Sequence, residues 1–216
     1  MNQEQGKPIP WTRKLVVPMI AGAICGGLVA FATTQLFDTD WVGAAGPSRM
    51  FAGVIGALYV LLAVGVLVGA MSPALGEKYL QAEDADELRE QQAMLVQSSF
   101  AMLAWGIGLF LLSLAAPVGP LAMPLVGIAV CVLMLAGIYF AWQSHRRSDE
   151  LFAAVNSQAT VYAYYLMFLV AGGWAVLAHL AVVPMFQPID LITTFFVVAL
   201  LAAFAAAGQR GMMVPR

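Results

Sequence analysis

Charged side chains are scarce in this chain of 216 residues, of which only 10% are Asp, Glu, Lys or Arg. The longest stretch without any of them covers residues 91–145, and shorter ones cover 15–37, 50–76, 151–189 and 191–209. A soluble domain of this size needs far more charge on its surface, whereas a hydrocarbon solvent selects against ionic groups. With 62% hydrophobic residues, the composition therefore predicts a multi-pass membrane protein.

Patterns that bind metals or nucleic acids are also missing. The only two cysteines, Cys25 and Cys131, lie inside apolar segments, and neither a Cys-x-x-Cys nor a His-x-x-x-His spacing occurs. We expect His179 and His145 near opposite faces of the bilayer, which excludes haem ligation by both within one chain. No basic stretch suits nucleic acid. We predict no cofactor and no metal.

The arrangement of apolar segments predicts an all-α, polytopic bundle of six transmembrane helices. A bilayer core about 30 Å thick needs about 20 helical residues, and six segments qualify: roughly 15–36, 50–71, 94–114, 121–142, 158–181 and 189–208. Turn residues separate several of them. In particular, Pro-Val-Gly-Pro at 117–120 predicts a tight hairpin, so the third and fourth spans should be antiparallel neighbours.

This pattern divides the chain into a membrane domain and short polar parts. The expected parts are an N-terminal tail (1–14), a six-helix domain (15–208) and a C-terminal tail (209–216). Segment 15–36 could imitate a signal peptide, but it is long enough to span, so we interpret it as the first helix. Two cytoplasmic loops are expected, at about 73–92 and 144–156.

The basic residues predict the orientation. Cytoplasmic segments of bacterial inner-membrane proteins are enriched in Lys and Arg. With the N-terminus inside, the outer side of this chain holds only Arg49, and the remaining nine basic residues are cytoplasmic: Lys7, Arg13, Lys14, Lys78, Arg89, Arg146, Arg147, Arg210 and Arg216. We therefore predict a bacterial inner-membrane protein with both termini in the cytoplasm.

The two expected cytoplasmic loops share an Asp-Glu-Leu tripeptide, at 86–88 and 149–151. In each loop the acids should open a helix, whose positive N-terminal end they complement. Each loop also joins an inward-running span to an outward-running one. The chain could thus contain a parallel repeat of helical hairpins.

The second of these loops carries a family resemblance. Residues 146–151, Arg-Arg-Ser-Asp-Glu-Leu, resemble the Arg-Arg-x-Asp-Glu-(Met or Leu) loop of small uncharacterised bacterial inner-membrane proteins. The closing residues 208–212, Gly-Gln-Arg-Gly-Met, are similar to the tail of some six-span members. The resemblance implies the membrane class and no particular chemistry.

Polar side chains gather at similar depth in two of the predicted spans. Gln97 and Ser98 enter the third span, and Thr160 and Tyr164 belong to a polar run in the fifth. Lipid offers these groups no hydrogen-bond partners. They either form a small vestibule for a polar molecule or lipid headgroup, or bond to one another between helices.

The cytoplasmic loops carry opposite charges. The first has an acidic segment that includes Asp86, Glu87 and Glu90, and the second contains Arg146 and Arg147. The acidic segment is either a solvated face or a docking surface, and the two arginines are its nearest intramolecular partners. We expect exposed pairs between them.

Small residues four apart are typical of close helix contacts in membranes. Such pairs occur at Gly22/Gly26, Gly65/Gly69, Ala202/Ala206 and Ala203/Ala207, and they could serve internal packing or an oligomer.

No pair of carboxylates, Ser/His pair or metal triad lies in or beside a span, so we do not expect an enzyme. The leading hypothesis is an accessory subunit, scaffold or sensor that acts through lipid and protein contacts. The alternative is an uncoupled transporter of a small neutral or lipid-like molecule.

Overall fold

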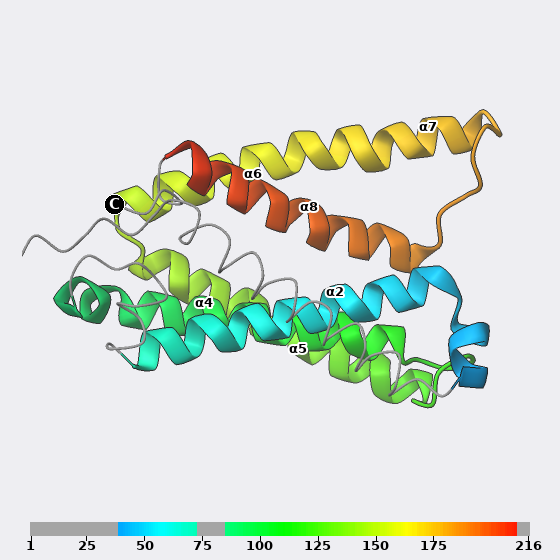
Figure 1. Cartoon of the computed structure of the whole chain (residues 1–216), viewed down its shortest axis with the longest axis horizontal. Helices are drawn as coiled ribbons and strands as arrows, with labels where there is room; N and C mark the ends of the chain where they lie inside the picture. The colour runs from blue at the N-terminus through cyan, green and yellow to red at the C-terminus, as the bar shows by residue number, and fades with distance from the viewer. Residues whose placement is uncertain (1–38, 73–84, 211–216) are drawn as a thin grey trace, which may run out of the picture.

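The computed structural model describes residues 39–72 and 85–210, and every long element in these ranges is helical. In chain order the helices are α2 (Thr39–Met71), α4 (Ala85–Ser113), α5 (Met123–Arg147), α6 (Glu150–Met167), α7 (Gly173–His179) and α8 (Pro188–Gln209). A π-helical turn, η1 (Phe168–Gly172), joins α6 to α7, so that 150–179 forms one continuous rod (Figure 1).

Five of these helical segments are long and apolar enough to cross a membrane. They are Gly46–Met71, Gln91–Ser113, Met123–Arg147, Glu150–His179 and Pro188–Gln209. They confirm five predicted spans and the polytopic all-α class. The predicted first span, 15–36, lies outside the described residues, as do both predicted tails apart from Gln209 and Arg210.

The turns between the spans follow the predicted chemistry. Gly46 has φ of 71° and ψ of 165°, which interrupts α2 directly before Pro47. A glycine tolerates this conformation because it has no Cβ. Residues 117–120 close the α4–α5 hairpin, where the Leu121 amide donates to the Leu114 carbonyl over 3.1 Å. Pro188 starts α8 at a position where the missing N–H costs no helical hydrogen bond.

The second predicted cytoplasmic loop is mostly helical. We predicted a loop over 144–156, but α5 continues to Arg147 and α6 begins at Glu150, which leaves only Ser148 and Asp149 between them. Asp149 is the N-cap of α6, and its side chain accepts a hydrogen bond from the Phe152 amide over 2.7 Å. Caps of this kind let helices continue beyond the apolar segment. The helix-opening role predicted for Asp149 and Glu150 is confirmed.

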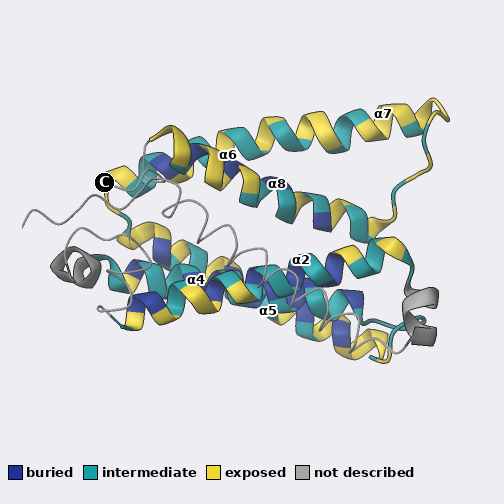
Figure 2. Ribbon diagram, in the orientation of Figure 1, coloured by how far each residue is buried: buried dark blue, intermediate teal, exposed yellow. Residues whose placement is uncertain are grey.

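Helices α2, α4 and α5 pack together as the core of the molecule. The backbones of α2 and α4 approach closely where Gly56 and Gly106 face each other: a Cβ on Gly56 would lie 2.8 Å from the Gly106 carbonyl oxygen. On the other side of α4, the Trp105 indole occupies the space that a side chain at Gly137 of α5 would need. Glycines therefore set both helix spacings, and buried residues concentrate in this layer (Figure 2).

The remaining helices form a more open hairpin. Helix α8 packs against α2 on one side and α6 on the other, and its buried residues include Ala202 and Ala206. The rod of α6, η1 and α7 lies beyond α8 (Figure 1), and no residue of its most apolar 18-residue window is buried. This region is held mainly by one helix–helix contact.

The small-residue pattern predicted only part of this packing. The fully buried Ala202 and Ala206 confirm that the α8 pair serves internal contacts. Gly65 makes no close internal contact with the described residues, because it is exposed and none of their atoms outside its own helix turn lies within 4 Å of its Cβ position. The close approach between α2 and α4 instead uses Gly56 and Gly106. These glycines lie on different helices, and the spacing within one sequence segment cannot reveal such a pair.

Candidate functional site

The predicted vestibule residues lie on two helices with different neighbours. Gln97 and Ser98 are half-buried on α4, whose main neighbours are α2 and α5. Thr160 and Tyr164 are exposed on α6, which packs on α8, and Tyr164 has 68% of its surface accessible. The described helices therefore do not bring the four residues together around one space.

Two hydroxyl groups of this set form hydrogen bonds within their own helices. Ser98 donates to the Leu95 carbonyl and Thr160 to the Asn156 carbonyl, each within its own helix. Gln97 is different, because its buried Oε1 has no hydrogen-bond partner. A buried, unpaired amide oxygen is costly, so Gln97 is the member of the predicted set with a buried polar atom that has no partner among the described residues.

Of the predicted docking surface, the structure describes the side chains of the two arginines, Arg146 and Arg147. The side chains of Asp86, Glu87 and Glu90 lie outside the described residues, although the backbone of 85–90 is helical. Arg146 places its guanidinium carbon 4.8 Å from the centre of the Trp142 ring, a cation–π contact within α5. Arg147 is exposed at the end of the same helix.

Several buried polar groups join helices to one another. The Tyr59 hydroxyl of α2 donates to the Phe196 carbonyl of α8 over 2.7 Å, and the two rings meet edge to face with centres 5.0 Å apart. Ser144 of α5 donates to the Met94 carbonyl of α4 over 3.2 Å. Arg49, the one basic residue predicted outside, donates to the Ala115 carbonyl in the α4–α5 turn. These groups use their hydrogen-bonding capacity in the fold.

A polar cluster lies where the C-terminal end of α8 meets α6. We call it the α8-end cluster, and it consists of Gln158, Tyr162, Gln209 and Arg210. Gln158 Nε2 donates to the Tyr162 hydroxyl over 2.7 Å and to Gln209 Oε1 over 2.9 Å. The Tyr162 hydroxyl also donates to Gln209 Oε1, and Arg210 Nε donates to Gln158 Oε1 over 3.0 Å. The cluster ties the two ends of the α6–α8 hairpin together.

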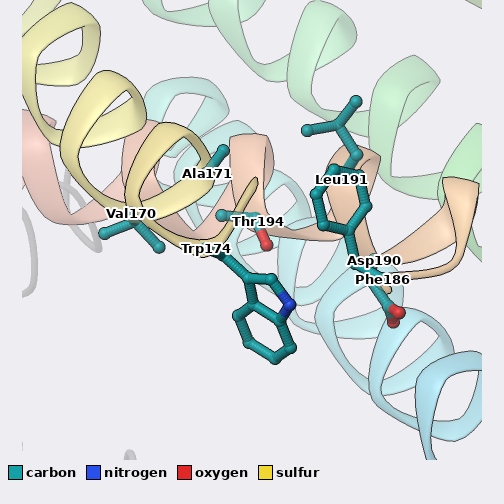
Figure 3. Close-up of a pocket in the computed structure, with 7 residues that line it drawn as sticks. All are labelled: Val170, Ala171, Trp174, Phe186, Asp190, Leu191 and Thr194. Atoms are coloured by element: carbon teal, nitrogen blue, oxygen red, sulfur yellow. The ribbon is translucent and has the colours of Figure 1, made fainter. Parts of the chain in front are cut away.

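A shallow hollow of about 30 Å³ lies near the other end of the same hairpin (Figure 3). One wall comes from η1 and α7, and the other from α8 and the residues before it. Asp190 lies at its edge but is committed to the helix start, since its carboxylate accepts from the Gln187 amide over 2.8 Å. Trp174 donates its indole N–H to the Pro184 carbonyl over 3.0 Å. The complete lining is Val170, Ala171, Trp174, Phe186, Asp190, Leu191 and Thr194.

The titratable and metal-binding side chains are scattered. Within 39–72 and 85–210, no three His, Cys, Asp or Glu residues gather closely enough to hold a metal ion. His179 ends α7, whereas His145 lies in the last turn of α5, next to the start of α6. About 45 Å of helix separates His179 from Glu150, at 1.5 Å per residue. Cys131 is an exposed free thiol, and Cys25 lies outside the described residues.

Comparison of the chain with protein-family models, with curated proteins and with solved structures gives no match. The resemblance of residues 146–151 to a family loop therefore stays a prediction. The geometry of the chain's own residues carries the functional argument.

Two of the four residues of the α8-end cluster, Gln158 and Tyr162, belong to the polar run in the predicted fifth span. Their i, i+4 spacing places them on one helix face. Gln209 and Arg210 were interpreted as part of a cytoplasmic tail. Their position immediately after a 20-residue apolar segment was the available signal, because it places them at the membrane surface.

Proposed function

We propose that this protein is a non-enzymatic component of the bacterial inner membrane, an accessory subunit, scaffold or sensor that acts through lipid and protein contacts. The observation that carries the proposal is the use of the interior polar groups. The hydroxyl groups of Tyr59 and Ser144 donate hydrogen bonds to neighbouring helices. Those of the buried residues Ser99, Ser113 and Thr193 donate to carbonyls of their own helices. Gly56 and Gly106 form a close contact between α2 and α4, and the Trp105 indole fills the space beside Gly137 between α4 and α5.

The exposed rod of α6, η1 and α7 supports contacts outside the chain. One side of α6 packs on α8, and the exposed apolar side chains of the rod include Tyr165, Phe168 and Leu169, each more than 60% exposed. Inside a bilayer such a face meets lipid, a second copy or another protein. An accessory component needs a face of this kind.

Site-specific photo-crosslinking in native membranes tests the proposal. A photoreactive residue at Tyr165 samples the rod, and one at Leu135, which is 68% exposed on α5, is the matched control. We expect a discrete protein adduct from Tyr165, recovered again when the partner is tagged instead, and only lipid adducts from Leu135. Absence of any protein adduct from both positions, together with solute flux in vesicles, would contradict the proposal.

The rival function is uncoupled transport of a small neutral or lipid-like molecule. Two observations favour it: Gln97 Oε1, which has no partner among the described residues, and the π-helical turn that ends at Gly172 and is followed by Gly173. Such turns are frequent at functional sites and can act as points of flexure. Vesicle flux assays on the wild type and on Gln97→Leu distinguish the two, since a transporter that uses Gln97 should lose flux, whereas a scaffold should show none.

The orientation is part of the proposal. Both termini and both Asp-Glu-Leu segments are placed in the cytoplasm, with His179 near the outer surface, because of the asymmetry of basic residues. A reporter enzyme that works only in the cytoplasm should be active when it is fused after Arg147 or after Arg216, and a reporter that works only in the periplasm should be inactive there. Periplasmic activity at either position would reverse the assignment.

A further inference from the structure

The α8-end cluster has hydrogen-bond directions that its own chemistry fixes. A guanidinium is a donor only. The atom of Gln158 that faces Arg210 Nε must therefore be the carbonyl oxygen, which leaves the Gln158 amide nitrogen to face Tyr162 and Gln209. Because this nitrogen donates, the facing atom of Gln209 must be its Oε1. The amide orientations of both glutamines follow from the single arginine.

In this arrangement the side-chain oxygens of the cluster all accept hydrogen bonds, whereas some of its N–H donors have no partner among the described residues. Gln158 Oε1 accepts from Arg210, the Tyr162 hydroxyl accepts from Gln158, and Gln209 Oε1 accepts from both Gln158 and Tyr162. The groups that remain are the two terminal nitrogens of the Arg210 guanidinium and the Gln209 Nε2. Both residues are exposed. The outer edge of the cluster therefore offers N–H donors and a full positive charge.

The position of the cluster selects the kind of anion. Arg210 follows the last residue of the apolar segment Pro188–Gln209, so it lies at the depth of the lipid headgroups. Exposed apolar side chains continue along both helices from this end, among them Val161 and Leu201. An arginine fork above an apolar surface matches a phosphate group that carries acyl chains.

We propose that the α8-end cluster binds a phosphate oxyanion, with Arg210 and Gln209 as the direct donors and Gln158 and Tyr162 as positioning residues. The favoured source is an anionic phospholipid headgroup, and a free phosphate ion shares the same chemistry. This inference rests on the proposed function, which it deepens by naming the class of lipid. It differs from the predicted vestibule, whose four residues are not part of the cluster.

Native mass spectrometry of the full chain in a neutral detergent tests the proposal. Phosphatidylglycerol is the probe, and diacylglycerol with the same acyl chains is the control without phosphate. We expect the wild type to retain phosphatidylglycerol at least about tenfold better, because charge-assisted hydrogen bonds are the strong ones. Equal retention of both lipids would overturn the proposal.

Two variants examine the donors separately. Arg210→Gln removes the charge. Gln209→Glu keeps the oxygen that accepts from Gln158 and Tyr162 but replaces the outward donors with an anionic oxygen, so the cluster persists while its outer edge is reversed. Each should lower phosphatidylglycerol affinity about tenfold. Unchanged affinity in Gln209→Glu, with an unchanged melting temperature, would contradict the assignment.

A matched control and a second probe complete the design. Arg147→Gln removes the same charge from an exposed helix end outside the cluster, and it should leave phosphatidylglycerol binding unchanged. A loss equal to that of Arg210→Gln would reduce the effect to general surface charge and overturn the site. Inorganic phosphate that displaces the lipid at millimolar concentration, with the same dependence on Arg210, would identify the free ion as a ligand of the site. If inorganic phosphate does not displace the lipid, the result supports the phospholipid headgroup as the ligand. The Tyr165 crosslinking result is independent of these outcomes, so the two proposals can fail separately.

Discussion

The layer of α2, α4 and α5 and the hairpin of α6–α7 with α8 solve the same packing problem differently. In the layer, helices approach through glycines, and each backbone contact leaves no space for a methyl group at Gly56 or Gly106. In the hairpin, helices meet along one side, and polar groups at the α8 end make the specific contacts. Without a hydrophobic effect between helices in lipid, van der Waals packing and hydrogen bonds are the available forces. Each region relies mainly on one of them.

The two regions also differ in how much of their surface is buried, and therefore in the expected effect of substitutions. The layer buries side chains on all three of its helices, whereas only Val155 is buried in the rod of 150–179, whose other residues are intermediate or exposed (Figure 2). Substitutions in the layer should therefore act on stability, and substitutions in the hairpin should act mainly on what the protein binds.

The largest expected effect concerns the glycine contacts. Gly106→Leu should destabilise the bundle by about 1–3 kcal/mol, because a side chain there must push α2 away from α4. Gly127→Leu is the matched control, since no atom lies within 4 Å of its Cβ position. Unfolding in mixed micelles measures both. Equal tolerance of the two changes would show that the helix spacing is not set by glycine.

The next effect concerns the bond between the two regions. Tyr59→Phe removes the hydroxyl that donates to the Phe196 carbonyl but keeps the ring contact. The expected loss of unfolding free energy is about 0.6 kcal/mol, the average for interhelical hydrogen bonds in membranes. A loss as large as that of Gly106→Leu would mean that polar bonds hold the layer to α8 more strongly than packing does.

A smaller effect is expected at the end of α5. Arg147→Ala removes an exposed side chain and should change the unfolding free energy by no more than about 0.5 kcal/mol. A stability loss well above this value would indicate that Arg147 is paired in a buried site or with a partner. The same measurement on Arg146→Ala should show a slightly larger loss, since Arg146 contacts the Trp142 ring.

No effect is expected at His179. Coupling of transport to protons needs a group that changes charge within the membrane, and His179 lies at the end of α7, too near one surface to relay a proton across alone. Reconstituted vesicles with an imposed pH gradient should show the same solute permeability for the wild type and His179→Ala. A gradient-driven flux that the substitution abolishes would replace both proposed functions with coupled transport.

Much of the helical layout could be predicted because it depends on local solvent preference. Residues 117–120 specify a hairpin through proline and glycine, and Asp149 specifies a helix start through its side-chain oxygen. Within the predicted cytoplasmic loop at 144–156, the structure is helical except at Ser148 and Asp149. Polar residues can continue a helix into water when a cap supplies its first hydrogen bonds.

The sequence by itself determined the apolar, multi-pass class of the chain, the approximate position of five spans, and the scarcity of ionic side chains within them. These properties follow from composition and from interactions within a few residues. Only the tertiary structure decided that Gly106 faces Gly56, that Trp105 fills the space beside Gly137, and that Arg210 orients Gln158. Each of these pairs joins different helices, and a contact between distant segments leaves no periodicity in either one.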